Sequence, residues 1–156
     1  MLYVLLKVAH VLSATLFLGA GLASVFYKLA ADRSGQPQAI AFVMRGVIRA
    51  DWLFTIPSGV LLPLTGLGMA HMAGMPLSTP WITAGIALYT VAGISWLPAF
   101  FLQYRMARYA QEAADSGQPL PPGYHRDTRI WALLGVPAFF AAVGAIFIMT
   151  GKGMIL

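Results

Sequence analysis

Residues 130–150 read IWALLGVPAFFAAVGAIFIMT and contain no charged side chain. The hydrocarbon core of a bilayer is roughly 30 Å thick, and a helix of about 20 apolar residues crosses it. This stretch therefore has both the length and the composition of a transmembrane helix. Arg129 and Lys152 flank it, at the two positions where such a helix leaves the lipid.

Three further stretches of the same kind precede this one. Residues 8–27, 52–70 and 81–103 are mostly apolar, and none of them contains an acidic residue, a lysine or an arginine. Each is expected to be helical, because lipid offers no partner to a free backbone N–H or C=O group. We therefore predict an all-α fold, an integral membrane antiparallel four-helix bundle that forms one transmembrane domain over residues 1–156.

The composition excludes several other classes of protein. Of the 156 residues 59% are hydrophobic and only 10% are charged, whereas about 25% of a soluble domain is charged. A chain with this many apolar residues is not expected to be disordered. It has no cysteine, which excludes disulfides and cysteine-ligated metals. Its basic segments lack interleaved aromatic residues, so nucleic-acid binding is not indicated.

The basic residues predict the orientation in the membrane. Four lie between the first and second spans, four lie between the third and fourth, and none lies in residues 71–80. The positive-inside rule places the two basic connections in the cytoplasm. Both termini and residues 71–80 then face outward, to the periplasm, in a multi-pass protein of a bacterial inner membrane. Two basic residues, Lys7 and Lys152, remain on the outward side.

Two histidines are expected at that outward side. His10 lies one turn inside the first span, and His71 directly follows the second. Imidazole is a usual haem ligand, and helical bundles often hold cofactors between facing helices. We therefore predict haem b, with His10 as the first axial ligand and His71 as the candidate second. Lys7 and Lys152 would meet the anionic propionates. The alternative for His10 is a packing or proton-transferring histidine.

Methionines are concentrated beside one of these histidines. Met69, Met72 and Met75 lie close in sequence to His71. Thioether and imidazole groups suit copper, especially Cu(I). Copper handling by this outward cluster is therefore the alternative to haem. Methionine is also an adaptable filler of helix interfaces, so a cofactor-free structural or assembly role is a third alternative.

The acidic residues do not suggest a catalytic pair. Asp51 is the only acid near a span, and an ion pair with Arg49 is expected at the cytoplasmic border. Residues 107–128 are expected to form a small polar connection that contains Asp127 and a solvated His125. Arg105 and Arg108 are expected to extend the third helix beyond the membrane, and residues 116–119 and 121–123 are expected to break it. Since no two carboxylates face each other within a span, proton-coupled transport is not indicated.

Small residues recur along three of the spans. Such residues let transmembrane helices approach closely, and they would also permit a homodimer. They are Ala9, Ser13, Ala20 and Ser24 in the first span, Gly59, Gly66 and Gly68 in the second, and Gly135, Ala138, Ala142 and Ala145 in the fourth.

Several short motifs carry a resemblance to known families. Residues 7–12, KVAHVL, followed by GAG at 19–21, resemble the first helix of HemJ-type protoporphyrinogen oxidases and of CopD-like membrane proteins. The segments PSGV at 57–60 and GVPA at 135–138 are similar to a group of small four-span bacterial membrane proteins without an assigned function. In HemJ-type proteins a first-helix histidine binds haem, and the resemblance implies this role for His10. The CopD resemblance implies copper at the outward Met/His cluster.

The sequence thus favours a membrane haem protein with a redox or electron-transfer role, as a haem-dependent oxidoreductase would have. Its expected partners are the lipid bilayer and a quinone or porphyrin substrate.

Overall fold

The fold is known from a computed structural model, which describes residues 1–151 and contains only helices in that range. This confirms the all-α prediction. In chain order the helices are α1 (Leu2–Ser34), α2 (Pro37–Ala50), the π-helix η1 (Asp51–Thr55), α3 (Ile56–Met72), α4 (Pro80–Ser116) and α5 (Pro122–Gly151).

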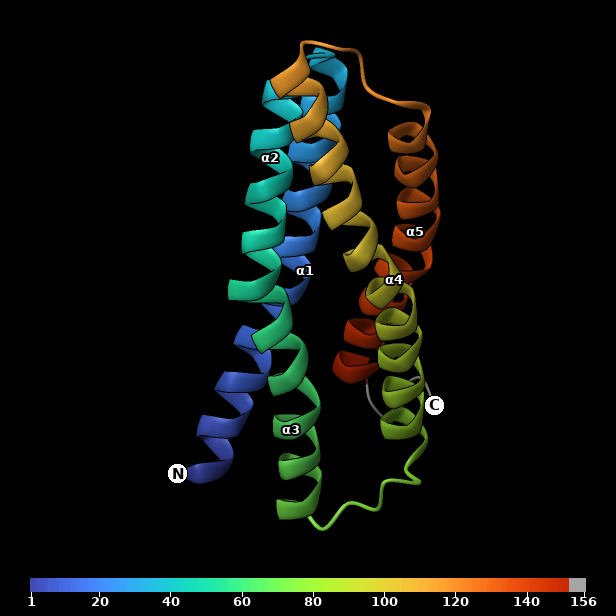
Figure 1. Cartoon of the computed structure of the whole chain (residues 1–156). Coiled ribbons are helices and arrows are strands. Elements are labelled where there is room, and N and C mark those ends of the chain that lie inside the picture. Colours follow the sequence, from blue (N-terminus) through green and yellow to red (C-terminus); the bar gives the residue numbers. More distant parts are fainter. Residues whose placement is uncertain (152–156) are drawn as a thin grey trace.

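Four helical segments are long and apolar enough to cross a membrane. They are α1, the continuous run from α2 through η1 to α3, α4, and α5. Figure 1 shows that the N-terminus, the α3–α4 connection and the end of α5 lie at one end of the bundle, which we call the histidine end. The α1–α2 and α4–α5 connections lie at the other, the basic end. The predicted pairing of the two basic connections is thereby confirmed.

Glycines at positive φ end two of the long helices. Gly35 has φ 65° and follows α1, while Gly117 has φ 66° and follows α4. This left-handed conformation is strained for residues with a Cβ, so glycine stops each helix at little cost. Pro37 then opens α2 and Pro122 opens α5, at positions where a missing N–H leaves no bond broken.

The polar segment over residues 107–128 consists mainly of the ends of two helices. Helix α4 continues to Ser116 and α5 begins at Pro122, so most of that polar segment is helical. The extension of the helix past Arg108 and its break at residues 116–119 are as predicted, whereas residues 122–128, expected in the connection, belong to α5. A helix that leaves the lipid continues while its residues favour helix, and here it ends only at Gly117.

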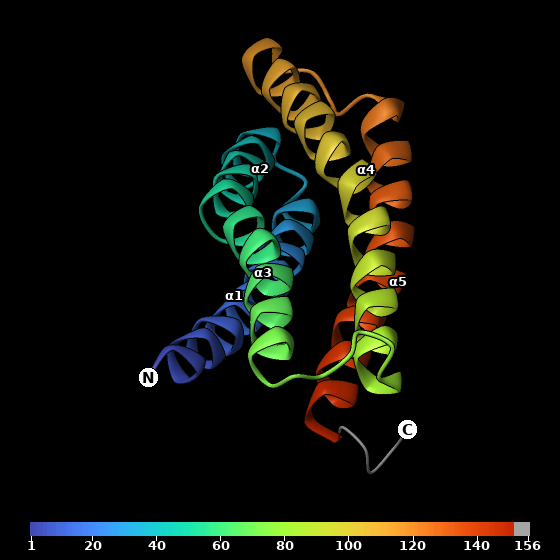
Figure 2. The ribbon, with the colours of Figure 1, turned by 90° about the horizontal axis from the view of Figure 1, so that it is seen from below.

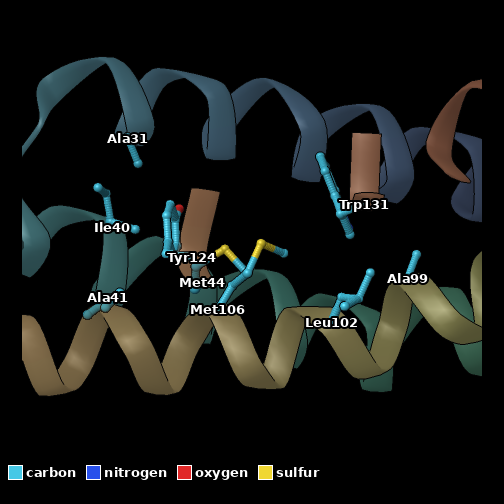
Figure 3. Close-up of a cluster of buried hydrophobic side chains, with 10 residues drawn as sticks. Ala31, Ile40, Ala41, Met44, Ala99, Leu102, Met106, Tyr124 and Trp131 are labelled. Carbon is cyan, nitrogen blue, oxygen red and sulfur yellow. The ribbon is translucent and has the colours of Figure 1, made fainter. Parts of the chain in front are cut away.

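Most of the buried apolar side chains gather at the basic end. Met44 of α2 and Met106 of α4 are completely buried there, next to Tyr124 and Trp131 of α5 (Figure 3). Helix α2 supplies its share from one face, at the spacing of Ile40, Ala41, Met44 and Val47. The segment before the second span is therefore amphipathic. The four spanning segments are therefore fixed to one another mainly at this end.

Toward the histidine end the bundle separates into two helix pairs. Helix α1 packs on α3, and α4 packs on α5 (Figure 2). In the most apolar windows of α1 and α5, only 6% of residues are buried within the chain. The remaining apolar surface is what the lipid covers in a membrane protein.

Glycines of α3 receive side chains of α1, as the small-residue pattern predicts. A Cβ placed on Gly59 would lie 3.5 Å from the Phe17 ring, and one on Gly66 would lie 3.2 Å from His10 Cε1. Gly68 packs against Leu6 in the same way. Close packing of α1 on α3 thus depends on these three glycines.

Candidate functional site

His10 is held between α1 and α3 by two polar contacts. Its Nδ1 lies 3.0 Å from the Leu62 carbonyl oxygen and 2.9 Å from Thr65 Oγ1. The Thr65 hydroxyl donates its one proton to a backbone carbonyl of its own helix, 2.6 Å away on Leu61. Since both partners of Nδ1 then act as acceptors, Nδ1 must carry a proton and donate it.

This arrangement determines which ring nitrogen of His10 can bind a metal. A neutral imidazole with its proton on Nδ1 has a free lone pair on Nε2. Histidines that ligate metals usually donate their other N–H to a carbonyl or a similar acceptor, which fixes the ring orientation. The contacts of His10 with Leu62 and Thr65 supply this kind of support.

The second predicted ligand lies further along the same helix. His71 is exposed, near the end of α3, and lies five residues beyond the Gly66 that touches His10. At 1.5 Å per residue the separation along the helix axis is about 8 Å. The structure therefore places both histidines toward one end of α3, but it brings only His10 into the α1–α3 interface.

The predicted propionate-binding lysines are Lys7 and Lys152. Lys7 is exposed on α1, one turn from His10. Lys152 lies outside the described residues.

The methionine cluster lies in the last turn of α3 and the residues that follow it. Met69 and Met75 are half-buried, and His71 and Met72 are exposed. The Met75 N–H donates to the Ala70 carbonyl at 3.0 Å, and this bond folds the chain back over the helix end. The backbone of Met75 therefore stays close to the last turn of α3, which carries the other three residues of the cluster. Over residues 1–151, no three His, Cys, Asp or Glu side chains form a group that could hold a metal ion.

Asp51 does not form the predicted ion pair with Arg49. Its side chain is 3% exposed, and no ion pair joins it to Arg49 or to another basic residue in the described part of the chain. The polar side chains within hydrogen-bonding reach of its carboxylate are Thr55, Trp96 and Gln103. The prediction was wrong because residues two apart point to different sides of a helix, and Asp51 is on the side that faces α4.

A polar network that the sequence did not indicate lies at the basic end. The Lys28 ammonium is buried and forms an ion pair with Asp32 at 2.6 Å. It also contacts Thr128 Oγ1 at 3.3 Å and lies 5.3 Å from the ring centroids of both Tyr124 and Trp131. The Tyr124 hydroxyl donates to Asp32. The i, i+4 spacing of Lys28 and Asp32 is visible in the sequence, but burial by α5 is not.

A second buried carboxylate belongs to α5. Asp127 is 1% exposed and its Oδ2 lies 3.0 Å from Arg105 Nε of α4. Arg126 lies 3.3 Å away on the other oxygen. The expectation that Asp127 belongs to a solvated connection was therefore wrong, because the helical start of α5 turns this residue toward α4. His125, its neighbour but one, is exposed as expected.

Comparison with known proteins gives one match. The model of the family described as "Predicted integral membrane protein (DUF2269)" matches residues 4–153, nearly the whole chain. No curated protein and no solved structure matches.

Proposed function

From the premise that the chain belongs to the DUF2269 family of predicted integral membrane proteins, we propose that it is a membrane b-type haem protein with a redox role. Its protein ligand to the iron is His10, through Nε2. The observation that carries the proposal is the pair of contacts on His10 Nδ1. Because Nδ1 holds the ring proton, the lone pair of Nε2 is free to bind iron.

The donor chemistry of the site fits this cofactor. Imidazole is a common axial ligand of haem iron, and a b-type haem needs no covalent attachment to cysteine, which this chain lacks. A bound haem supplies one-electron chemistry. Leu62 and Thr65 hold the proton on Nδ1 and orient the ring, and the exposed apolar surface of α1 lets a hydrophobic cofactor or a quinone reach it from the bilayer.

His71 is the candidate for the second ligand, and Lys7 and Lys152 are the candidates for the propionates. A second histidine ligand would give a six-coordinate, low-spin iron, whereas His10 alone would leave one position open. The spin state of the bound haem therefore decides the role of His71.

The test is the visible spectrum of the protein purified from cells supplied with haem precursor. A Soret band that shifts on addition of dithionite and is absent from His10→Ala supports the proposal. The variant Thr65→Val removes one acceptor from Nδ1 without removing the ligand. We expect it to bind haem about 10- to 100-fold more weakly, as is typical when a supporting partner of a metal ligand is removed.

The matched control is His125→Ala, which removes an exposed histidine at the opposite end of the bundle. This variant should keep the full haem content. A colourless wild-type protein contradicts the proposal, and so does a His10→Ala protein that keeps the wild-type spectrum.

Copper handling is a second candidate, and the folded end of α3 favours it. The bond between the Met75 N–H and the Ala70 carbonyl keeps the backbone of Met75 close to the last turn of α3, which carries Met69, His71 and Met72. Metal analysis of the same preparations distinguishes the two functions. Bound copper that is lost when Met69, Met72 and Met75 become leucine would support copper in place of haem.

A further inference from the structure

Helix α5 begins beside a surface pocket that carries positive charge. The pocket has a volume of about 580 Å³, which is within the range of sites that bind small molecules. Arg126 and Arg129 line it from α5, and Leu120 of the α4–α5 connection and Ile130 are among its apolar residues. No acidic side chain of the described chain lines it. Because α5 starts there, the pocket lies at the basic end of the bundle (Figure 1).

The charge of these two arginines is only partly compensated within the protein. Arg126 Nε lies 3.3 Å from Asp127 Oδ1, but the same carboxylate also forms the 3.0 Å ion pair with Arg105. Over residues 1–151, no ion pair joins Arg129 to an acidic residue. The three arginines and the one carboxylate of this region therefore leave an excess of positive charge. The pocket favours an anion and disfavours a second cationic group.

An exposed apolar stripe of α5 continues from this pocket into the membrane span. The stripe consists of Ile130, Leu133, Val136 and Phe140, which are 41%, 73%, 55% and 66% exposed. Residues three or four apart lie on one face of a helix, and the two arginines precede the stripe at the same spacing. Ten residues of helix rise about 15 Å, which is half of the hydrocarbon thickness of a bilayer. The stripe therefore has the length of one lipid leaflet.

We propose that the pocket binds the headgroup of an acidic phospholipid, with Arg126 and Arg129 as donors to its phosphate. A guanidinium group can donate two parallel N–H bonds to phosphate oxygens. Basic pockets of membrane proteins bind anionic headgroups at the membrane surface. An ethanolamine lipid fits less well, because its ammonium group would add a positive charge where positive charge is already in excess.

The apolar stripe identifies the phosphate as that of a lipid. The acyl chains of a lipid whose phosphate lies at Arg129 would cover the α5 surface from Ile130 to Phe140. A free phosphate compound would use the two arginines and leave this surface without a role. The two sources of a phosphate group are therefore distinguishable by experiment.

This site is separate from the proposed haem ligand. The pocket lies at the basic end of the bundle, whereas His10 lies in the part of α1 that leads to the histidine end. The two proposals can therefore fail independently of each other.

The experiment titrates the full-length protein in detergent with phosphatidylglycerol or with phosphatidylethanolamine of the same acyl chains. Native mass spectrometry measures the dissociation constant of the first lipid bound. The wild type should prefer phosphatidylglycerol about 30-fold, which corresponds to about 2 kcal/mol for two arginines near a membrane surface. The double variant Arg126→Gln with Arg129→Gln should lose this preference. The control, Arg33→Gln with Arg49→Gln, removes two exposed arginines that do not line the pocket and should keep it.

The single variants Arg126→Gln and Arg129→Gln provide a second test that does not depend on the folding of the double variant. Each should reduce the preference about 5-fold. Equal binding of the two lipids by the wild type would overturn the proposal. An equal loss in the control would also overturn it, because general attraction to the basic end would then explain the preference.

A competition experiment separates a lipid from a free phosphate compound. Glycerol 3-phosphate carries the same phosphate group without acyl chains, so a large excess of it should leave phosphatidylglycerol bound. If it displaces the lipid from the wild type, the pocket is a site for a water-soluble phosphate compound and the proposal is overturned.

Discussion

The buried ion pair of Lys28 and Asp32 makes a quantitative prediction about stability. Asp32→Asn removes the charge that compensates Lys28, whose side chain is only 1% exposed. The asparagine still offers an oxygen to the Tyr124 hydroxyl, so the change acts mainly on the ion pair. The same chain contains a matched control, because Arg108 and Glu112 form an i, i+4 pair with side chains that are 67% and 65% exposed.

The expected loss follows from these exposures. Removing one partner of a buried ion pair costs about 3–5 kcal/mol, because the other charge stays buried. Lys28 keeps its contacts with Thr128 and with two aromatic faces, which also favour the ammonium. We therefore expect the lower end, about 3 kcal/mol, which is on the order of a 100-fold change in the folded-to-unfolded ratio. Glu112→Gln should cost about 0–1 kcal/mol, as exposed pairs do.

The assay is reversible unfolding in mixed micelles, followed by tryptophan fluorescence. It is applied to Asp32→Asn, Glu112→Gln and Lys28→Met. Lys28→Met should cost less than Asp32→Asn, because Asp32 is 21% exposed and can be hydrated when its partner is lost. The double variant that combines Lys28→Met with Asp32→Asn should be more stable than Asp32→Asn alone. If Asp32→Asn and Glu112→Gln destabilise the protein equally, the reasoning from burial is refuted.

Two further interactions make predictions that the same unfolding assay checks. Tyr89→Phe removes the 2.6 Å hydrogen bond from the tyrosine hydroxyl to the Gly59 carbonyl. That carbonyl has no helical donor because residue 63 is proline, so the change should lower the free energy of unfolding by about 1–3 kcal/mol. In a Pro63→Ala background, where residue 63 supplies the N–H, the same change should cost less; an equal cost contradicts this account. Asp127→Asn, which leaves Arg105 without its partner, should cost about 1–3 kcal/mol because Arg105 is 45% exposed; no measurable loss would contradict the pairing.

The spans could be predicted from the sequence because each depends on its own composition. A run such as residues 130–150 must be helical in lipid whatever surrounds it, since every backbone group needs an internal partner. The helix ends at Gly35 and Gly117 are local in the same sense. His10 could be selected as a candidate because an ionisable residue within a span is costly and therefore suggestive.

The residues around these candidates could not be predicted. Nothing local to Asp51 indicates that Gln103 lies opposite it, since the two residues come together only through the packing of α2 against α4. The same holds for Lys28. The positive-inside rule counts it as a basic residue at the cytoplasmic end of a span, but Tyr124 and Trp131 of α5 cover it. Charge counting recognises such residues and cannot tell which of them are buried.

The sequence by itself determined that the chain is four membrane-crossing helical segments with its basic connections at one end, because hydrophobicity and charge act on each segment separately. Only the tertiary structure decided which polar groups meet. It gave the His10 ring its proton acceptors on α3, and it buried Asp51 beside Trp96 and Gln103 of α4. The physical reason is that a hydrogen bond or an ion pair depends on the rotation of one helix against another, and that rotation is set by packing across the whole bundle.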